Sequence, residues 1–400
     1  MMHVAIIGAG QAGAALAARL RSAGHIGAIT LIGDEPVAPY QRPPLSKAYL
    51  LGEMPLDRLL LRAPDFWAAQ DIWLVTGTPV TAVDAAARTL RMGDETLAWD
   101  HLAFTTGAVV RRLPAAIGGD LPGVHYVRTL ADVDGMAPEF VAGRRVLIVG
   151  GGYIGLEAAA VAAKKGLRVT VVEAAPRILQ RVAAPETSDY FRALHTAHGV
   201  AVLEGTGLAR LTGAGRVTGA ELADGRQLAC DFAIVGVGIL PATALAEAAG
   251  LVLDNGIATD DQGRTSAPQV WAAGDCASFP HAGGRLRLES VPGAIDMAEC
   301  VAENILGAGK TYVPKPWFWS DQYDVKLQIA GLNTGYDRVI VRDGGAVRSH
   351  WYYRGDRLLA VDAMNDPRGF MIARRLIDAG RSADPVRVAD PATDLKALLA

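Results

Sequence analysis

The stretch Val4-Ala-Ile-Ile-Gly8-Ala-Gly10-Gln-Ala-Gly13 decides the fold, because an apolar run enters three glycines and an alanine-rich segment follows. The same order recurs at Val146-Leu-Ile-Val-Gly150-Gly-Gly152-Tyr-Ile-Gly155. In each stretch we expect a strand to turn into a helix, with glycines for the tight turn, for backbone approach to a pyrophosphate and for close helix packing. The N-H groups at such a helix start favour negative charge. The two stretches therefore predict two dinucleotide-binding units.

Each unit closes with an acidic residue after a second apolar run, near the expected spacing of about 20 residues for a ribose-hydroxyl acceptor. The candidates are Asp34 or Glu35 in the first unit and Glu173 in the second. A carboxylate at that position accepts the 2'-hydroxyl of NADH and repels a 2'-phosphate. The two alanines after Glu173 supply no compensating cation, so we expect NADH to be preferred, with Arg177 as the cation that could weaken this preference.

Composition limits the class of protein. The chain has 400 residues, of which 50% are hydrophobic and 20% charged, as in a globular α/β protein of two or three domains. The net charge of -3 and the lack of long basic tracts argue against a nucleic-acid or anionic-membrane partner. No apolar run reaches the roughly 18 residues of a membrane span, and no charged, cleavable leader is recognisable, so we expect a cytoplasmic protein.

The cysteines and histidines predict neither a disulfide framework nor a metal site. Cys230, Cys276 and Cys300 are far apart and lack paired spacing, so we expect buried small side chains. The eight histidines show no ligand spacing either. We interpret His195 and His198 as an exposed helix end.

The order of the segments predicts an α/β fold with two Rossmann-like dinucleotide-binding domains and a C-terminal α+β domain that contains a small antiparallel sheet. The first domain is expected to be discontinuous, formed by residues 1–110 and 236–310. Residues 111–235 are expected to form the inserted second domain. From residue 311 onward, short alternating segments separated by Gly and Asp turns predict the antiparallel sheet of the third domain, 311–400.

Several segments end in residues suited to ligand contact. The proline-rich loop 39–47 carries Arg42 and Lys47, two cations that fit an anion. Predicted strands stop at the small residues Thr106-Gly107 and at Gly238, where a backbone can approach a ligand closely. A further strand delivers Asp275 to its carboxyl end, where ligands gather in such sheets, and its carboxylate could bind a sugar or ribityl chain.

Taken together, these motifs resemble the glutathione-reductase-like flavoproteins, and within them the NADH-dependent ferredoxin reductases of bacterial oxygenase systems. The resemblance covers nearly the whole chain and rests on both glycine motifs, Arg42-Pro-Pro-Leu-Ser-Lys47, Thr105-Thr-Gly107, Gly274-Asp275, Glu289-Ser-Val-Pro and Pro316-Trp-Phe-Trp-Ser-Asp-Gln-Tyr323. It implies that the first unit binds FAD and the inserted unit binds NADH. It also implies that the C-terminal sheet covers the flavin face and helps to form a docking surface.

The resemblance also implies the functional residues. The expected catalytic residues are Lys47, Tyr153, Glu157 and Trp319. The expected cofactor contacts are Gly8, Gly10, Gly13, Asp34, Glu35, Arg42, Lys47, Thr106, Gly107, Gly150, Gly152, Ile154, Gly155, Glu173, Gly238, Asp275, Glu289, Val291 and Trp319. The chain departs from the family at Gly293 and Met297, where related reductases commonly have Asn and Gln.

Four aromatic and acidic residues have alternative interpretations. Tyr153 is expected at the flavin face as a gate that the nicotinamide displaces, and the alternative is ordinary interdomain packing. Glu157 lies one helical turn further on and could accept a hydrogen bond from the nicotinamide carboxamide or pair with Lys47. Its alternative is a solvent-exposed glutamate. Trp317 and Trp319 are candidates for the exposed flavin edge or for core aromatics.

The acceptor is predicted partly from what the sequence lacks. No cysteine lies between residues 1 and 229, so the flavin has no neighbouring dithiol and must pass its electrons on directly. We expect an acidic 2Fe-2S ferredoxin that docks transiently and supplies a haem or Rieske-type oxygenase, with the reductase as a monomer. Candidate docking cations are Arg285, Arg287, Lys326, Arg374 and Arg375. The alternatives are a reductase of rubredoxin or of a small quinone or radical acceptor, and a redox-responsive interaction module like apoptosis-inducing factor.

Overall fold

The computed structural model describes residues 1–399 and divides the chain into two compact units. The first contains Met1–Gln41, Leu56–Val109 and Ile239–Pro316. The second contains Arg42–Pro55, Val110–Gly238 and the chain from Trp317 onward. The three-domain boundaries expected from the sequence stay a prediction.

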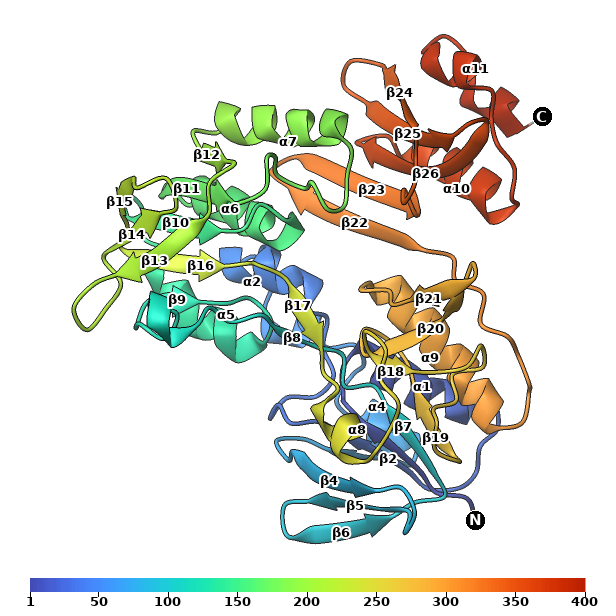
Figure 1. The fold of residues 1–400 in the computed structure, drawn as a ribbon. Helices are drawn as coiled ribbons and strands as arrows, with labels where there is room; N and C mark the ends of the chain where they lie inside the picture. The colour runs from blue at the N-terminus through green and yellow to red at the C-terminus, as the bar shows by residue number, and fades with distance from the viewer. Residues whose placement is uncertain (400) are drawn as a thin grey trace. The chain divides into compact units, whose positions relative to one another are not determined.

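A five-stranded parallel sheet forms the centre of the first unit, and Figure 1 labels its strands β2, β7 and β19. The strand order is β19-β7-β1-β2-β3. Strand β1 is buried at all four positions, because a parallel sheet is covered on both faces and its strands are apolar throughout. Helices α1 (Gln11–Ser22) and α9 (Val291–Ile305) pack against each other over this sheet. The strands are β1 (Val4–Ile7), β2 (Ile29–Ile32), β3 (Ile72–Val75), β7 (His101–Phe104) and β19 (Val270–Ala272).

Small antiparallel sheets and short helices complete the first unit. One sheet contains β4 (Val80–Asp84), β5 (Thr89–Met92) and β6 (Glu95–Ala98). A second sheet contains β18 (Ile257–Ala258), β20 (Ala277–His281) and β21 (Gly284–Leu286), and β8 (Ala108–Val110) pairs with β17 (Ile239–Pro241). The short helices are α3 (Leu56–Leu59), α4 (Phe66–Ala69) and α8 (Ala244–Ala248).

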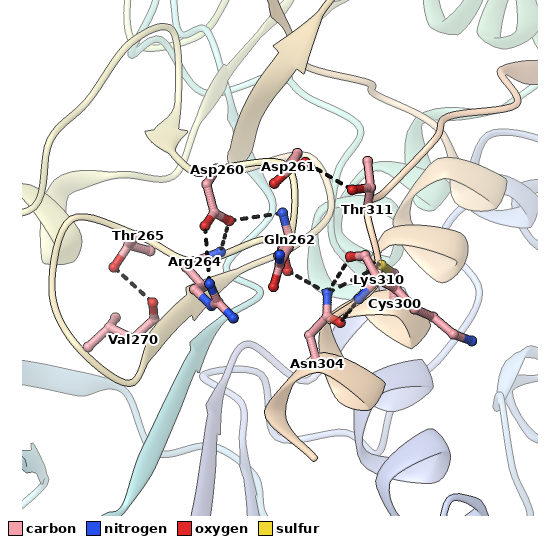
Figure 2. Close-up of polar contacts among 10 residues, drawn as sticks. All are labelled: Asp260, Asp261, Gln262, Arg264, Thr265, Val270, Cys300, Asn304, Lys310 and Thr311. Atoms are coloured by element: carbon pink, nitrogen blue, oxygen red, sulfur yellow. Dashed lines mark hydrogen bonds and ion pairs between the residues drawn. The ribbon is translucent and has the colours of Figure 1, made fainter. Parts of the chain in front are cut away.

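Asn304, near the end of α9, fastens the loop that precedes β19 (Figure 2). Its side-chain amide donates to the carbonyl oxygens of Gln262 (2.9 Å) and Lys310 (2.8 Å) and accepts from the Lys310 amide (2.6 Å). Asp260 closes the same loop by accepting from the backbone amides of Gln262 and Arg264. Asn304 is buried, so these bonds satisfy a polar group that would otherwise be costly to bury. They tie the loop at 260–264 to the segment that follows α9.

A second parallel sheet lies in the second unit, in the order β12-β11-β10-β16-β9. Its strands are β9 (Val124–His125), β10 (Arg145–Val149), β11 (Arg168–Glu173), β12 (Ala201–Glu204) and β16 (Phe232–Val235). The associated helices are α5 (Leu130–Met136), α6 (Tyr153–Lys164) and α7 (Pro185–Ala197). A three-stranded antiparallel sheet follows, with β13 (Leu208–Thr212), β14 (Gly219–Leu222) and β15 (Gln227–Ala229).

The C-terminal part of the second unit contains the antiparallel sheet that the sequence predicts, and a helix backs it. Its order is β22-β23-β26-β25-β24, with β22 (Trp317–Gln322), β23 (Val325–Gly331), β24 (Arg338–Asp343), β25 (Arg348–Arg354) and β26 (Arg357–Met364). Helix α10 (Pro367–Asp378) packs on β23 and β26 and shares a core with them. The unit also contains α2 (Ala48–Leu51), α11 (Pro385–Ala389) and the short 3-10 turns η1 (Pro43–Ser46), η2 (Ala115–Ile117), η3 (Ala137–Glu139) and η4 (Leu395–Leu399).

Over the described residues 1–399, no helix has the length and apolar character that crossing a membrane requires.

Candidate cofactor-binding site

The glycines of the first motif divide into packing positions and one open position. Gly8 has a φ of +108°, and a side chain there would collide with the Thr105 carbonyl at the end of β7. A side chain at Gly13 would collide with the Gly8 carbonyl, so α1 lies directly on the turn. A methyl group at Gly10, in contrast, would meet no atom within 4 Å. Since no side chain caps α1 at Gly10, this open space at the helix start fits a pyrophosphate.

The second motif repeats this division of roles residue by residue. Gly150 has a φ of +107° and lies against the Gly236 carbonyl, and Gly155 lies against the carbonyl of Gly150. Gly152 has nothing within 4 Å of a would-be methyl group, and no side chain caps α6. The next but one residue, Ile154, keeps 44% of its surface exposed beside this opening. Both motifs therefore fit a dinucleotide.

Glu173 and Arg177 bear on the choice between NADH and NADPH. Glu173 ends β11, and its carboxylate accepts from the backbone amides of Gly151 and Ala175, both at 2.7 Å. The acid is thus held at the glycine turn. Arg177 donates to the Ser188 hydroxyl (2.5 Å) and to the Gln180 carbonyl (3.4 Å), so its guanidinium is occupied by the start of α7.

In the first unit the structure distinguishes the two candidate acids. Glu35 accepts a hydrogen bond of 2.6 Å from the buried Tyr40 hydroxyl, which fixes its carboxylate near the end of β2. Asp34 is exposed. Glu35 is therefore the better-placed ribose acceptor.

Other residues of the first unit hold the carboxyl edge of its sheet together. The Thr106 hydroxyl donates to the Ala242 carbonyl (2.7 Å), and the Ala242 amide donates to Gly107. Asp275 follows Gly274, whose φ of +81° and close approach to Ala12 place the acid beside the start of α1.

The segment after Asp275 contains a half-buried ion pair between Arg287 and Glu289. Arg287 pairs with Glu289 at 2.7 Å and donates to the Asp275 carbonyl at 3.1 Å, with 9% of its side chain exposed. The expectation that Arg287 is a surface docking cation is therefore wrong, because its side chain is only 9% exposed and its two terminal nitrogens bind Glu289 and the Asp275 carbonyl. Arg285 is likewise bound to Ser278 and the Thr259 carbonyl.

Helix α9 begins immediately after this pair. Its first residue is Val291, and the Ser290 hydroxyl caps the helix by accepting from the Gly293 amide. Met297 is buried in the core beneath it. Gly293 and Met297, the two positions that depart from the family, thus belong to the helix cap and to the core, respectively.

The second unit brings the neighbouring residues Ser46 and Lys47 to Glu157, which lies more than 100 positions further along the chain. Glu157 is only 2% exposed, so its interpretation as a surface glutamate is wrong. Its Oε2 pairs with Lys47 Nζ (2.8 Å) and accepts from Ser46 Oγ (2.7 Å), and its Oε1 accepts from Ser320 Oγ (2.7 Å). A buried carboxylate requires such compensation. Arg42, in the same loop, donates to the Arg128 carbonyl.

Tyr153 begins α6 and packs against Phe318 of β22, with ring centroids 5.1 Å apart. Its hydroxyl is buried without a hydrogen-bond partner in the described structure, and burial raises the pKa of Tyr153 well above its usual value. The packing interpretation thus describes this conformation, and the gate stays a prediction.

The two tryptophans of β22 have different surroundings. Trp317 packs on the C-terminal core beside Phe370, with the Arg374 guanidinium over its ring. Trp319 lies against Trp317, with tilted rings whose centroids are 5.5 Å apart, but does not belong to that core. Trp319 is therefore the better candidate for an exposed cofactor edge. Of the candidate docking cations, Arg285, Lys326 and Arg375 are exposed.

His195 contradicts its predicted exposure. It is completely buried, on the face of α7 that also buries Phe191 and Thr187. Its Nε2 lies 2.8 Å from Gln322 Oε1, which explains how the polar ring is tolerated inside. Sequence reasoning also missed Ser46, Ser320 and Gln322. The alternation of β22, which places Ser320 and Gln322 on one face, is the only signal for two of them.

The expected burial of Cys230 and Cys276 is confirmed, and Cys300 is partly exposed.

Comparison with known proteins identifies the family. Residues 2–298 match the pyridine nucleotide-disulphide oxidoreductases and residues 317–399 match the reductase C-terminal domain. The chain belongs to this family, which confirms the predicted fold class and the resemblance. It is 43% identical to the rhodocoxin reductase of Rhodococcus erythropolis, over all of this chain and 95% of that protein. It is 40% identical to the putidaredoxin reductase of Pseudomonas putida, over all of this chain and 97% of that protein.

Two solved ferredoxin reductase structures match this chain over its full length. The reductase in the covalent putidaredoxin reductase–putidaredoxin complex matches with a TM-score of 0.95 and 40% identity over 100% of this chain and 98% of that one. The ferredoxin reductase for the CYP199A2 system from Rhodopseudomonas palustris matches with a TM-score of 0.96 and 40% identity over both complete chains.

Proposed function

We propose that this chain is an FAD-dependent NADH:ferredoxin oxidoreductase, which passes electrons from NADH through FAD to a 2Fe-2S ferredoxin that supplies a haem or Rieske-type oxygenase. The observation that carries the proposal is the pair of glycine turns, each of which leaves open space at an uncapped helix start. Full-length relatives named as ferredoxin, rhodocoxin and putidaredoxin reductases support the acceptor.

The two cofactors are assigned to different segments. FAD would be held by Gly8, Gly10, Gly13, Glu35, Arg42, Thr106, Gly107 and Asp275, and the segments 1–110 and 236–310 would form its domain. NADH would be held by Gly150, Gly152, Gly155 and Glu173 in the domain 111–235. Residues 311–400 would form the interface domain, which presents Trp319. Bound there, FAD would supply hydride acceptance from NADH and one-electron release to an iron–sulfur acceptor.

The chain contributes binding, orientation and charge compensation. Hydride transfer needs no general base, so the protein has to align its ligands and exclude water. Glu173 is fixed at the turn where it would accept from the NADH ribose and repel a 2'-phosphate, and Arg177 is tied to α7. Lys47 and Glu157 form a buried ion pair, which would hold the reacting rings. The donor NADH is an intracellular coenzyme, so we place the enzyme in the cytoplasm.

Cytochrome c reduction by the purified yellow protein tests this proposal. Rates are measured with NADH or NADPH, with and without a 2Fe-2S ferredoxin. We expect a large ferredoxin-dependent increase with NADH and little activity with NADPH. If NADH bleaches the flavin rapidly but several ferredoxins add nothing, the acceptor is wrong, and rubredoxin and quinones are tested next. If NADH does not bleach the flavin, the donor is wrong.

A further inference from the structure

A chain of buried polar side chains connects Glu157 of α6 to α7 through strand β22. Ser320 Oγ donates to Glu157 Oε1 at 2.7 Å. Gln322 Nε2 donates to Ser320 Oγ at 3.2 Å, and Gln322 Oε1 lies 2.8 Å from His195 Nε2. The His195 Nδ1 atom lies 3.1 Å from the Tyr323 hydroxyl. Three segments far apart in sequence are thus joined by one line of hydrogen bonds, all within the second unit.

Burial makes each link depend on the next. Ser320, Gln322 and His195 are completely buried, so water does not replace a missing partner. A buried polar group without its partner is destabilised, and its side chain tends to turn toward another donor or acceptor. Removing the imidazole would therefore free the Gln322 amide, and through it the Ser320 hydroxyl.

The direction of the bonds follows from the charge of His195. Burial lowers the pKa of His195 to about 4, so the ring is neutral at pH 7 and has one donor and one acceptor nitrogen. Its Nε2–H donates to Gln322 Oε1, because a carbonyl oxygen only accepts. The Gln322 amide donates to Ser320, which leaves the Ser320 hydroxyl to donate to Glu157. The Tyr323 end of the line agrees with this assignment. Burial raises the pKa of Tyr323, so its hydroxyl stays protonated and donates to His195 Nδ1.

The position of Tyr323 supports a role for this line beyond packing. Tyr323 lies in the two-residue turn between β22 and β23 with a φ of +56°. Gly, Asn and Asp are the usual residues at such a position, because a bulky side chain is disfavoured there. The turn nevertheless carries an aromatic ring, which contacts His195 edge-on and stacks on His198 at 3.6 Å.

We propose that His195 is a positioning residue for the nicotinamide site, which acts through Gln322 and Ser320 to hold the Glu157 carboxylate. Lys47 and Ser46 bind Oε2, while Ser320 donates to Oε1. This arrangement leaves acceptor capacity on Oε1 for an N–H donor of the bound nucleotide. The donor that fits is the carboxamide of the nicotinamide, and this step rests on the proposed function.

The test uses two nucleotides that differ only in that donor. NAD+ has a carboxamide, whereas 3-acetylpyridine adenine dinucleotide has an acetyl group without N–H donors. Their dissociation constants are measured by calorimetry on the flavin-loaded wild type and variants, together with the limiting rate of flavin reduction by NADH. We expect His195→Leu to weaken NAD+ binding about 10-fold, as for one lost hydrogen bond to a charged group, and to leave the analogue nearly unchanged.

Two further variants are matched to His195→Leu. His195→Gln keeps a side-chain N–H donor and is expected to restore most of the NAD+ affinity. His198→Leu, on the exposed face of the same helix end, is expected to bind both nucleotides like the wild type.

Ser320→Ala serves as a second variant in case His195→Leu does not fold. It removes only the hydroxyl that donates to Glu157. It is expected to discriminate between the two nucleotides as His195→Leu does. Equal weakening of both nucleotides in Ser320→Ala, or wild-type affinity for both, would overturn the positioning role. Failure of the wild type to bind NAD+ would instead refute the proposed function.

Discussion

Alanine at Gly155 and alanine at Gly152 should damage the protein in opposite ways, although the two glycines are three positions apart. A Cβ at Gly155 would lie 2.1 Å from the Gly150 carbonyl oxygen, and real Cβ atoms essentially never come closer than 3.0 Å. Helix α6 would have to retreat by about 1 Å from a rigid backbone atom, an overpacking that costs about 3 kcal/mol. The better helix propensity of alanine returns about 1 kcal/mol. We expect Gly155→Ala to lose about 2 kcal/mol of unfolding free energy.

Gly152→Ala should fold normally and bind NADH poorly. Gly152 has a φ of -81° and a ψ of 179°, which alanine adopts without strain, and its methyl group would meet no atom within 4 Å. The unfolding free energy should stay within about 0.5 kcal/mol of the wild type. The methyl group would stand where the pyrophosphate approaches the uncapped helix, and a loss of 1.4 to 2.7 kcal/mol there is roughly a 10- to 100-fold loss of affinity.

Urea unfolding, FAD content and calorimetric NAD+ titration of both variants decide the matter. We expect full FAD content in Gly152→Ala, since the substitution lies in the second motif. The reasoning is refuted if Gly152→Ala binds NAD+ like the wild type, or if Gly155→Ala unfolds at the wild-type urea concentration.

Three other predictions follow from the same geometry. Glu173→Ala removes the carboxylate that repels a 2'-phosphate, so the ratio of kcat/KM for NADH over NADPH should fall at least about 10-fold; an unchanged ratio would exclude this acid as the determinant. Lys47→Met leaves Glu157 buried without its cation and should cost about 3 kcal/mol in urea unfolding. Lys164→Met, which breaks an exposed ion pair, should cost less than about 1 kcal/mol, and equal costs would contradict the burial argument. Burial lowers the pKa of His350 to about 4, so only the unfolded state takes up this proton between pH 6.5 and 4. The stability contributed by the neutral ring is present above pH 6.5 and falls by about 3 kcal/mol on acidification toward pH 4, and His350→Phe should lack that part of the pH slope.

The sequence predicts those parts of the fold that depend on local turn chemistry. Gly8 and Gly150 require positive φ, and Gly13 and Gly155 allow a helix to lie on the preceding turn, so the motifs themselves specify both strand-to-helix units. The alternation after residue 311 likewise specifies the antiparallel sheet, because a half-buried strand has a period of two.

The buried polar contacts could not be predicted in this way. His195 and Gln322 are 127 positions apart, and Ser320 and Glu157 are 163 apart, so neither pairing has a local pattern. The sequence alone therefore predicts a surface position for a histidine near the end of a helix. Arg287 shows that a local pairing can be missed as well: it binds Glu289 only two positions away, and its contact with the Asp275 carbonyl depends on how the chain folds back before α9.

The most direct test of the central claim is an anaerobic stopped-flow experiment with the flavin-loaded protein, limiting NADH and excess oxidised 2Fe-2S ferredoxin. Flavin bleaching and ferredoxin reduction are followed at separate wavelengths. We predict rapid bleaching by NADH, slow bleaching by NADPH, and two ferredoxins reduced for each NADH consumed, because a two-electron donor meets a one-electron carrier. A protein that carries no FAD, or a reduced flavin that leaves ferredoxin oxidised while it reacts quickly with another acceptor, would contradict the account.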